Sequence, residues 1–261
     1  MFDLTTLETA LAGSLFAGKL HFSAVTGSTN LDALAAAQNN APHGSVYFTD
    51  EQTAGRGRSD HAWLSASGQG LYVSVLLRPS LPAARLPLLP LMAGLATVQA
   101  INAASGLKAD LRWPNDVLIG PRKAVGILVE ARAEREGKSV AVVGIGVNVH
   151  QREFAAALST PATSLDLEAS RSVSRQLLLI ELLKSLQAEV LLLEDEVSAK
   201  SIPQRVAAAS TWIEGRAVEV HGPQACRGVT EGLDVHGFLR VRSPEGLIVV
   251  QTGGIRALDS N

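Results

Sequence analysis

The sequence predicts an α+β protein in which a mixed, largely antiparallel sheet is flanked by helices and followed by a small C-terminal β-barrel. Strand-like and helical segments alternate along most of the chain. Three strand candidates between residues 110 and 149 are joined by short turns, which favours antiparallel neighbours. Beyond Trp212 the sequence shows short strands separated by glycine turns, as in small barrels. We therefore expect a large domain, residues 1–210, and a small domain, residues 211–261.

The first elements follow from helix-capping and β-rich patterns. Thr5 and Glu8 have the spacing of a capping box, which predicts a short opening helix. A strand is expected at residues 20–25. Ser28 then has the right chemistry for the N-cap of an alanine- and leucine-rich helix at residues 29–38. This arrangement places Ser28 at a strand-to-helix turn, where backbone amides are free to bind a ligand.

The remaining elements follow from β-rich alternation and from apolar residues at helical spacing. Strands are expected at residues 45–50, 70–77, 110–119, 124–131, 139–149, 217–220, 226–229, 238–241 and 247–250, and helices at residues 90–103 and 173–198, with a shorter one near Pro203. Residues 151–170 lack clear periodicity and are expected to be an irregular connection.

Composition narrows the classes of function. The net charge of −2 and the pI near 6.3 argue against a nucleic-acid-binding surface, so no DNA partner is expected. Cys226 is the one cysteine, which excludes an internal disulfide and fits a cytoplasmic location. The N-terminus has no signal-peptide pattern. The apolar stretch at residues 86–101 is interrupted by Pro87 and Pro90, so no membrane span is expected.

The most informative segment is the loop that contains Gly55-Arg56-Gly57-Arg58. Glycines let the backbone approach an anionic ligand, and guanidinium groups neutralise it, although a single such cluster is more often a solvated basic turn. Lys123 adds a third cation. The sequence has no Walker A motif and no nucleophile motif. Cations without a protein nucleophile suit a reaction in which the substrates supply both reacting groups, such as attack of a carboxylate on the α-phosphate of ATP.

The loop belongs to an ordered set of segments that resembles the biotin–protein ligases. The matching segments are Ser28-Thr29-Asn30, Gly55-Arg56-Gly57-Arg58 with Trp63, Arg112-Trp113-Pro114-Asn115-Asp116, Lys123 to Glu130, Gly144-Ile145-Gly146-Val147-Asn148, Ala162-Thr163-Ser164-Leu165 and Thr252-Gly253-Gly254-Ile255. Arg112 stands where the family often has lysine, and Ser59-Asp60-His61 replaces residues that are frequently basic. The order and spacing of the set make the resemblance specific.

The resemblance implies a fold like the class II synthetases and the biotin and lipoate ligases, with an SH3-like C-terminal barrel. It implies ATP and biotin as substrates, Mg²⁺ with the ATP, and transfer of biotin through biotinyl-5'-adenylate to one lysine of a biotin carboxyl carrier protein, a subunit of acetyl-CoA carboxylase. About twenty residues precede the first expected catalytic strand, so the resemblance is to the short form without an N-terminal DNA-binding domain. A homodimer through a sheet edge at residues 140–147 is also considered.

The resemblance also carries residue roles. The ureido ring of biotin would be held by Ser28, Thr29, Asn30 and Gln52, with Gly55, Gly57 and Gly126 completing the biotin site. The catalytic cations would be Arg56, Arg58 and Lys123, and the nucleotide would contact Arg58, Trp63, Arg112, Asn115, Lys123 and Asn148. No metal ligands are assigned. A urea offers one acceptor and two donors, so a site that satisfies all three rejects a plain fatty acid.

Simpler structural roles remain open for several of these residues. Ser28 also fits a helix cap, Asn115 a turn, Trp63 a core position, and Lys123 a solvated turn beside Arg122. A lipoate ligase or octanoyltransferase, which would share the fold, is the nearest enzymatic alternative. A DNA-binding regulator is the alternative from another class.

Overall fold

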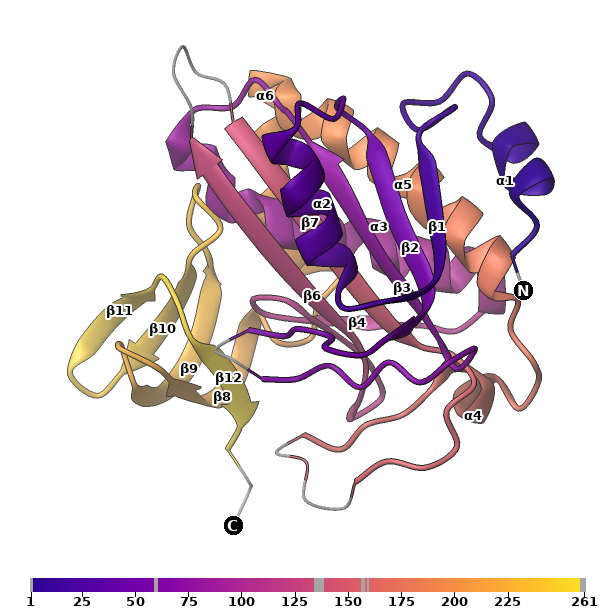
Figure 1. Cartoon of the computed structure of the whole chain (residues 1–261). Helices are drawn as coiled ribbons and strands as arrows, with labels where there is room; N and C mark the ends of the chain where they lie inside the picture. The colour runs from indigo at the N-terminus through magenta and orange to yellow at the C-terminus, as the bar shows by residue number, and fades with distance from the viewer. Residues whose placement is uncertain (1, 59–60, 134–138, 156–157, 159, 259–261) are drawn as a thin grey trace.

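A seven-stranded sheet forms the centre of the computed structural model, which describes residues 2–58, 61–133, 139–155, 158 and 160–258 (Figure 1). Its strands, in spatial order, are β1 (Leu20–Thr26), β2 (Ser45–Gln52), β3 (Gly70–Leu77), β7 (Ser139–Asn148), β6 (Arg122–Ala133), β5 (Asp116–Ile119) and β4 (Asp110–Arg112). Strands β1 and β2 are parallel, and every other neighbouring pair is antiparallel. The predicted α+β class with a mixed, largely antiparallel sheet is therefore confirmed.

Strand β7 lies in the middle of this sheet. It pairs with β3 on one side and with β6 on the other, and it is buried along nearly its whole length. The expectation of a sheet edge at residues 140–147 is therefore wrong, because the two edges are β1 and β4. The reason is topological: the chain returns from β6 into the gap beside β3, which local patterns do not reveal.

Helices cover the two faces of the sheet unequally (Figure 1). One face carries α2 (Thr29–Gln38) alone, and its core is small: Ala33 and Ala37 pack on Leu76, Val140 and Val142. The other face carries α3 (Leu89–Ser105), which follows the 3-10 turn η1 (Ala83–Leu88), and α5 (Arg175–Glu194), which pack together over the large core. The face of the sheet that α2 covers is therefore the one that carries polar side chains.

Helix η1–α3 is long and apolar enough to cross a membrane by length and composition, with 61% of the window buried inside the protein. Its apolar residues pack against α5 and the sheet. That burial is typical of a core helix rather than of a membrane span. The two prolines that interrupt the stretch, Pro87 and Pro90, lie inside η1 and at the start of α3, where a missing N–H is tolerated.

Most predicted elements have the expected position, and the helix at 29–38 and the strand at 70–77 have the expected ends. Three elements differ. Helix α1 (Leu4–Ala10) is capped by Asp3, whose carboxylate accepts from the amides of Thr5 and Thr6, so the capping box at Thr5 was wrong. The strand at 110–119 is split into β4 and β5 by a turn that contains the cis Trp113–Pro114 bond.

The long helix at 173–198 is also divided. It ends at Glu194 because Asp195 has an extended backbone and caps the short helix α6 (Glu196–Ala199). Helix α7 (Ile202–Ala208) follows as expected near Pro203, and α4 (Leu165–Ala169) is an unpredicted helix within the connection.

The C-terminal part of the chain forms a second sheet. Its strands are β8 (Glu214–His221), β9 (Cys226–Leu233), β10 (Leu239–Ser243), β11 (Gly246–Val250) and β12 (Gly254–Ala257). Their order, β11-β10-β9-β8-β12, leaves β11 and β12 unpaired with each other among the described residues. The sheet is open, and the predicted barrel is not confirmed. Residue 210, the proposed domain boundary, lies between α7 and β8.

Candidate functional site

Three glycines form a flat floor on the α2 side of the central sheet. Gly126 of β6 lies opposite Gly146 of β7, and Gly144 follows two residues earlier on the same face. A Cβ atom at Gly126 or Gly146 would collide with the indole ring of Trp63, and one at Gly144 would collide with the amide of Asn30. The absence of side chains on this floor therefore makes room for Trp63 and Asn30 to lie directly on the backbone.

A chain of polar side chains crosses the edge of this floor, and we call it the amide–hydroxyl network. Its members are Thr29, Asn30, Gln52, Ser65, Ser74 and Glu130. Gln52 Oε1 accepts from the backbone amide of Thr29 at 3.0 Å, and its Nε2 donates to Ser65 Oγ at 2.7 Å. The hydroxyl oxygens of Thr29 and Ser74 are 2.7 Å apart, and Ser74 Oγ donates to Asn30 Oδ1 at 2.6 Å. Asn30 Nδ2 donates to Glu130 Oε2 at 2.9 Å.

The predicted ureido-binding residues thus lie together. Thr29, Asn30 and Ser28 are almost fully buried at the start of α2, and Gln52 ends the neighbouring strand β2. Ser28 occupies the N-cap position as predicted, but its side chain makes no capping hydrogen bond. The helix start is instead tied to the sheet by Gln52, which receives the first amide.

The glycine–arginine loop folds into a tight turn over the site. The Gly57 amide donates to the His61 carbonyl at 2.7 Å, and the Trp63 amide donates to the Gly55 carbonyl at 2.9 Å. A Cβ atom at Gly55 would meet the Trp63 carbonyl, so this close approach requires glycine. The departures from the family pattern at Ser59 and Asp60 lie outside the described residues.

The two arginines of the loop have different partners. Arg56 Nη1 lies 3.2 Å from the Glu130 carboxylate and is partly exposed. Arg58 Nη1 donates to Asn115 Oδ1 at 2.9 Å and to the Gly253 carbonyl at 3.0 Å. Burial lowers the pKa of the Arg58 guanidinium. The structure therefore does not gather Arg56 and Arg58 at one point.

A second polar group, which we call the cation cluster, consists of Arg112, Asp116 and Lys123. Asp116 is the centre: its Oδ2 is 2.6 Å from Arg112 Nη2, and its Oδ1 is 2.6 Å from Lys123 Nζ. Lys123 Nζ also lies 5.6 Å from the ring centre of Trp63. The cluster and the amide–hydroxyl network thus lie toward two ends of the region that Trp63 covers.

Asn148 and Trp63 are the last two of the predicted nucleotide-binding residues. Asn148, at the end of β7, donates to the Thr163 carbonyl at 3.1 Å, and the Thr163 amide donates in turn to the Lys123 carbonyl at 2.9 Å. The indole Nε1 of Trp63 is buried and has no hydrogen-bond partner among the described residues. Asn148 and Lys123 are therefore held by one segment, residues 161–163.

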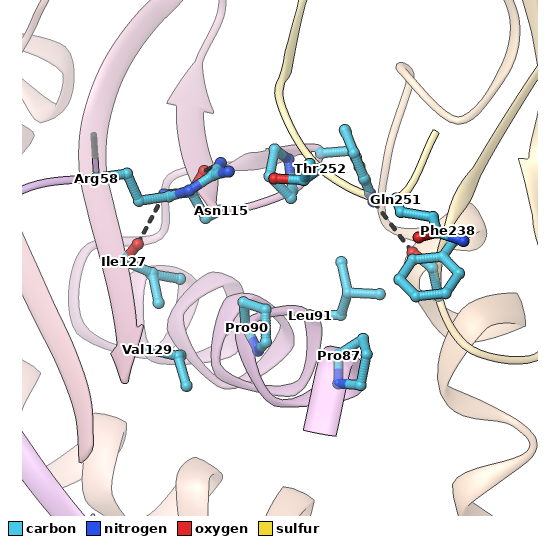
Figure 2. A pocket seen from close by; sticks show the side chains of 13 residues that line it. Arg58, Pro87, Pro90, Leu91, Asn115, Ile127, Val129, Phe238, Gln251 and Thr252 are labelled. Atoms are coloured by element: carbon cyan, nitrogen blue, oxygen red, sulfur yellow. Dashed lines mark hydrogen bonds between the residues drawn. The ribbon is translucent and has the colours of Figure 1, made fainter. Parts of the chain in front are cut away.

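A separate pocket lies on the opposite side of β6, between α3 and the C-terminal sheet (Figure 2). Its volume is about 160 Å³. Figure 2 shows Arg58 and Asn115 on one wall, facing Thr252, Gln251 and Phe238 across the opening, with Pro90 and Leu91 below. Arg58 and Asn115 thus belong to this pocket, whereas the other predicted site residues lie on the α2 side of the sheet.

Sequence reasoning missed several functional candidates. Asp116 was considered only as a turn residue or as a residue that orients the triphosphate and its magnesium, Glu130 was in a matched segment without an assigned role, and Ser65 was not considered. Ser74 could have been found, because it is a polar residue in the middle of β3, a strand whose other side chains are apolar and buried. The direct contact of Arg58 with Gly253 joins residues 195 positions apart, which no local pattern could predict.

The described residues do not form a preassembled Mg²⁺ site. They contain no group of three or more His, Cys, Asp or Glu side chains that could hold a metal ion. Both carboxylate oxygens of Asp116 already face cations. Magnesium usually binds through one or two carboxylates together with the phosphates of its nucleotide, so the residues present do not by themselves define its site.

Known proteins resemble the chain in both sequence and structure. The model of the biotin/lipoate A/B protein ligase family matches residues 22–148. The biotin–[acetyl-CoA-carboxylase] ligase of Paracoccus denitrificans is 32% identical over 231 residues, which cover 86% of this chain and 95% of that protein. The chain belongs to the biotin protein ligase family.

Two further similarities refine this assignment. The bifunctional ligase/repressor BirA of Bacillus spizizenii is 42% identical over 158 residues, which cover 60% of this chain and 49% of that protein. The chain thus spans about half the length of this relative. The biotin protein ligase of Aquifex aeolicus, solved in complex with biotin and ATP, superposes with a TM-score of 0.79 at 28% identity, covering 93% of this chain and 100% of that one.

Proposed function

We propose that this chain activates biotin with ATP and transfers it to a lysine of a biotin carboxyl carrier protein. A biotin carboxylate oxygen attacks the α-phosphorus of ATP, the bond to pyrophosphate breaks, and biotinyl-5'-adenylate forms. The lysine amine then attacks the acyl carbon, AMP leaves, and the amine loses a proton. The observation that carries the proposal is a largely buried amide–hydroxyl network and a cation cluster at two ends of one glycine-floored region.

The amide–hydroxyl network has groups suited to binding the ureido ring of biotin. Ser28, Thr29 and Asn30 are buried and Gln52 is partly buried, and an unpaired polar group in such a place costs about 1–3 kcal/mol. A ligand that satisfies these groups is preferred over an acyl chain that does not. Gly55, Gly57 and Gly126 would keep the walls close to the ring, because a Cβ atom at Gly55 would meet Trp63 and Gln52, and one at Gly126 would meet the Trp63 ring.

The cation cluster is suited to a reaction between two anions, the biotin carboxylate and the α-phosphate of ATP. Lys123 and Arg112 are held near each other by Asp116, and Lys123 would move from this carboxylate to the biotin carboxylate and the α-phosphate. Arg56 and Arg58, now bound to Glu130 and to Asn115, would close over the adenylate with their loop. Trp63, Asn115 and Asn148 would contact the nucleotide.

The decisive experiment is ATP-dependent labelling of a biotin carrier domain by the purified protein, with lipoate and octanoate as competing acids. We expect biotin alone to be transferred, with one pyrophosphate released per biotin. Transfer of lipoate or octanoate in place of biotin would favour the alternative activities of the family. Failure to transfer any of the three would overturn the proposal.

The proposal includes Mg²⁺ bound with ATP, a cytoplasmic location where ATP and the carrier meet, and no role in binding DNA. The net charge of −2 supports the last point. A gel shift with random duplex DNA at low salt tests it, because retardation at micromolar protein would contradict it. Sedimentation of the protein with and without biotin tests self-association.

A further inference from the structure

We propose that Ser74 is a positioning residue that makes the Thr29 hydroxyl an acceptor, and that Glu130 sets this polarity. The inference rests on the proposed function and names what recognises the ureido N–H of biotin. Ser74 is completely buried in β3, and its hydroxyl lies between Thr29 and Asn30. It acts on the ligand only through Thr29.

Glu130 fixes the direction of the hydrogen bonds, because a carboxylate can only accept them. Asn30 Nδ2 therefore donates to Glu130 Oε2 at 2.9 Å, and its second hydrogen points to the Leu128 carbonyl at 3.5 Å, another acceptor. Two acceptors on one side fix the orientation of the amide. Asn30 Oδ1 must then be the atom that faces Ser74.

An amide oxygen also accepts only, so Ser74 donates its single hydroxyl proton to Asn30 Oδ1 at 2.6 Å. The neighbouring contact, 2.7 Å between the oxygens of Ser74 and Thr29, needs a proton from one of them. Ser74 has none left. Thr29 is therefore the donor, and its proton is committed to Ser74.

Gln52 Oε1 competes for the same proton, but less effectively. It lies 3.2 Å from Thr29 Oγ1, against 2.7 Å for Ser74 Oγ, and it already accepts from the Thr29 amide at 3.0 Å. The shorter contact keeps the proton. Thr29 Oγ1 is thus left with acceptor capacity, which matches a ureido N–H.

Gln52 offers the complementary group. One hydrogen of its Nε2 is used by Ser65 Oγ at 2.7 Å, and the other is left for a ligand acceptor such as the ureido oxygen. Acceptor and donor therefore stand side by side, fixed before the ligand arrives. An acyl chain without N–H groups would leave Thr29 unsatisfied, which is how the arrangement discriminates.

The test is a double-mutant cycle read by calorimetric titration with biotin, without ATP. Ser74→Ala frees the Thr29 proton, and we expect biotin affinity to fall roughly tenfold. Thr29→Val removes the acceptor and is expected to cost roughly tenfold or more. In the double variant we expect the affinity of Thr29→Val alone, because Ser74 then has nothing to orient. Desthiobiotin, which keeps the urea, should lose the same factor.

Ser139→Ala is the matched control, since Ser139 is equally buried, bonds a carbonyl, and lies at the far end of β7. It should bind biotin normally. If Ser74→Ala does not fold by circular dichroism, the isosteric Ser74→Cys, a weak donor, is used in the same cycle. Losses that multiply in the double variant, or normal binding by the Ser74 variant, would overturn the inference alone. No binding by the wild type would overturn the proposed function and this inference with it.

Discussion

The amide–hydroxyl network and the cation cluster lie on the same side of one sheet, yet they prepare for a ligand in opposite ways. In the network, hydroxyl and amide groups bond one another in a direction that the Glu130 carboxylate fixes, and under the proposed function this leaves specific atoms for the ligand. In the cluster, Lys123 and Arg112 share one carboxylate, Asp116, and under the proposed function they would exchange it for substrate. Under the proposed function, ligand selection needs groups that stay in place, whereas a reaction between two anions needs cations that can change partner.

The cation cluster is expected to give the largest effect. Lys123→Ala should abolish measurable adenylate formation, because loss of a partly buried counter-charge costs about 3–5 kcal/mol, or roughly a hundred- to several-thousandfold in rate. The measurement is biotin-dependent pyrophosphate release, with circular dichroism to check the fold. Arg122→Ala is the control, since Arg122 pairs with Glu168 at 2.8 Å and is more exposed. Near-normal release by the Lys123 variant would remove that residue from the mechanism.

Substitutions of Arg58 test whether adenylate formation depends on the charge of this side chain or on its hydrogen-bonding geometry. Arg58→Ala should also abolish measurable adenylate formation. Arg58→Lys should recover only a small part, because one ammonium group cannot reproduce the fork that reaches both Asn115 and Gly253. Pyrophosphate release measures both variants. Full activity of the lysine variant would show that charge alone suffices, and full activity of the alanine variant would exclude Arg58 from catalysis.

The network should give an intermediate effect that falls on affinity. Gln52→Leu leaves the Thr29 amide and the ligand without a partner, at a cost of about 1–3 kcal/mol, or roughly ten- to a hundredfold in biotin affinity. Calorimetric titration measures it. Gln38→Leu is the control, because Gln38 is exposed and lies at the far end of α2, the helix that begins at Thr29. Unchanged affinity of the Gln52 variant would place Gln52 outside the biotin site.

The loop that joins the two regions should give the smallest effect. Biotin is expected to slow tryptic cleavage after Arg56 and Arg58 by a few fold, because under the proposed function the loop closes over the ligand and its backbone becomes less accessible to the protease. Electrophoresis of timed digests, with and without saturating biotin, measures the rate. Equal rates in the loop under both conditions would contradict ligand ordering, and cleavage elsewhere serves as the internal reference.

The sequence alone determined part of the local structure. Helix 29–38 and strand 70–77 were predicted to the residue, because their signals lie within or directly beside the segments: an N-cap serine before an alanine-rich stretch, and an apolar run between Gly70 and Arg78-Pro79. The grouping of Ser28, Thr29 and Asn30 at one helix start was predicted for the same reason. The ordered motifs also identified the family, since the order and spacing of short segments can be recognised without knowing how they pack.

Tertiary structure decided which of these groups touch. The insertion of β7 between β3 and β6 brings Ser74, Gly144 and Glu130 onto one face, although Ser74 lies far from the other two in the sequence. The same packing sends Arg58 to the carbonyl of Gly253 and Arg56 to Glu130, so the loop cations diverge. The open second sheet likewise depends on which strands meet at its ends. Periodicity reports the face of a strand but not its neighbour, and hydrogen-bond direction depends on neighbours.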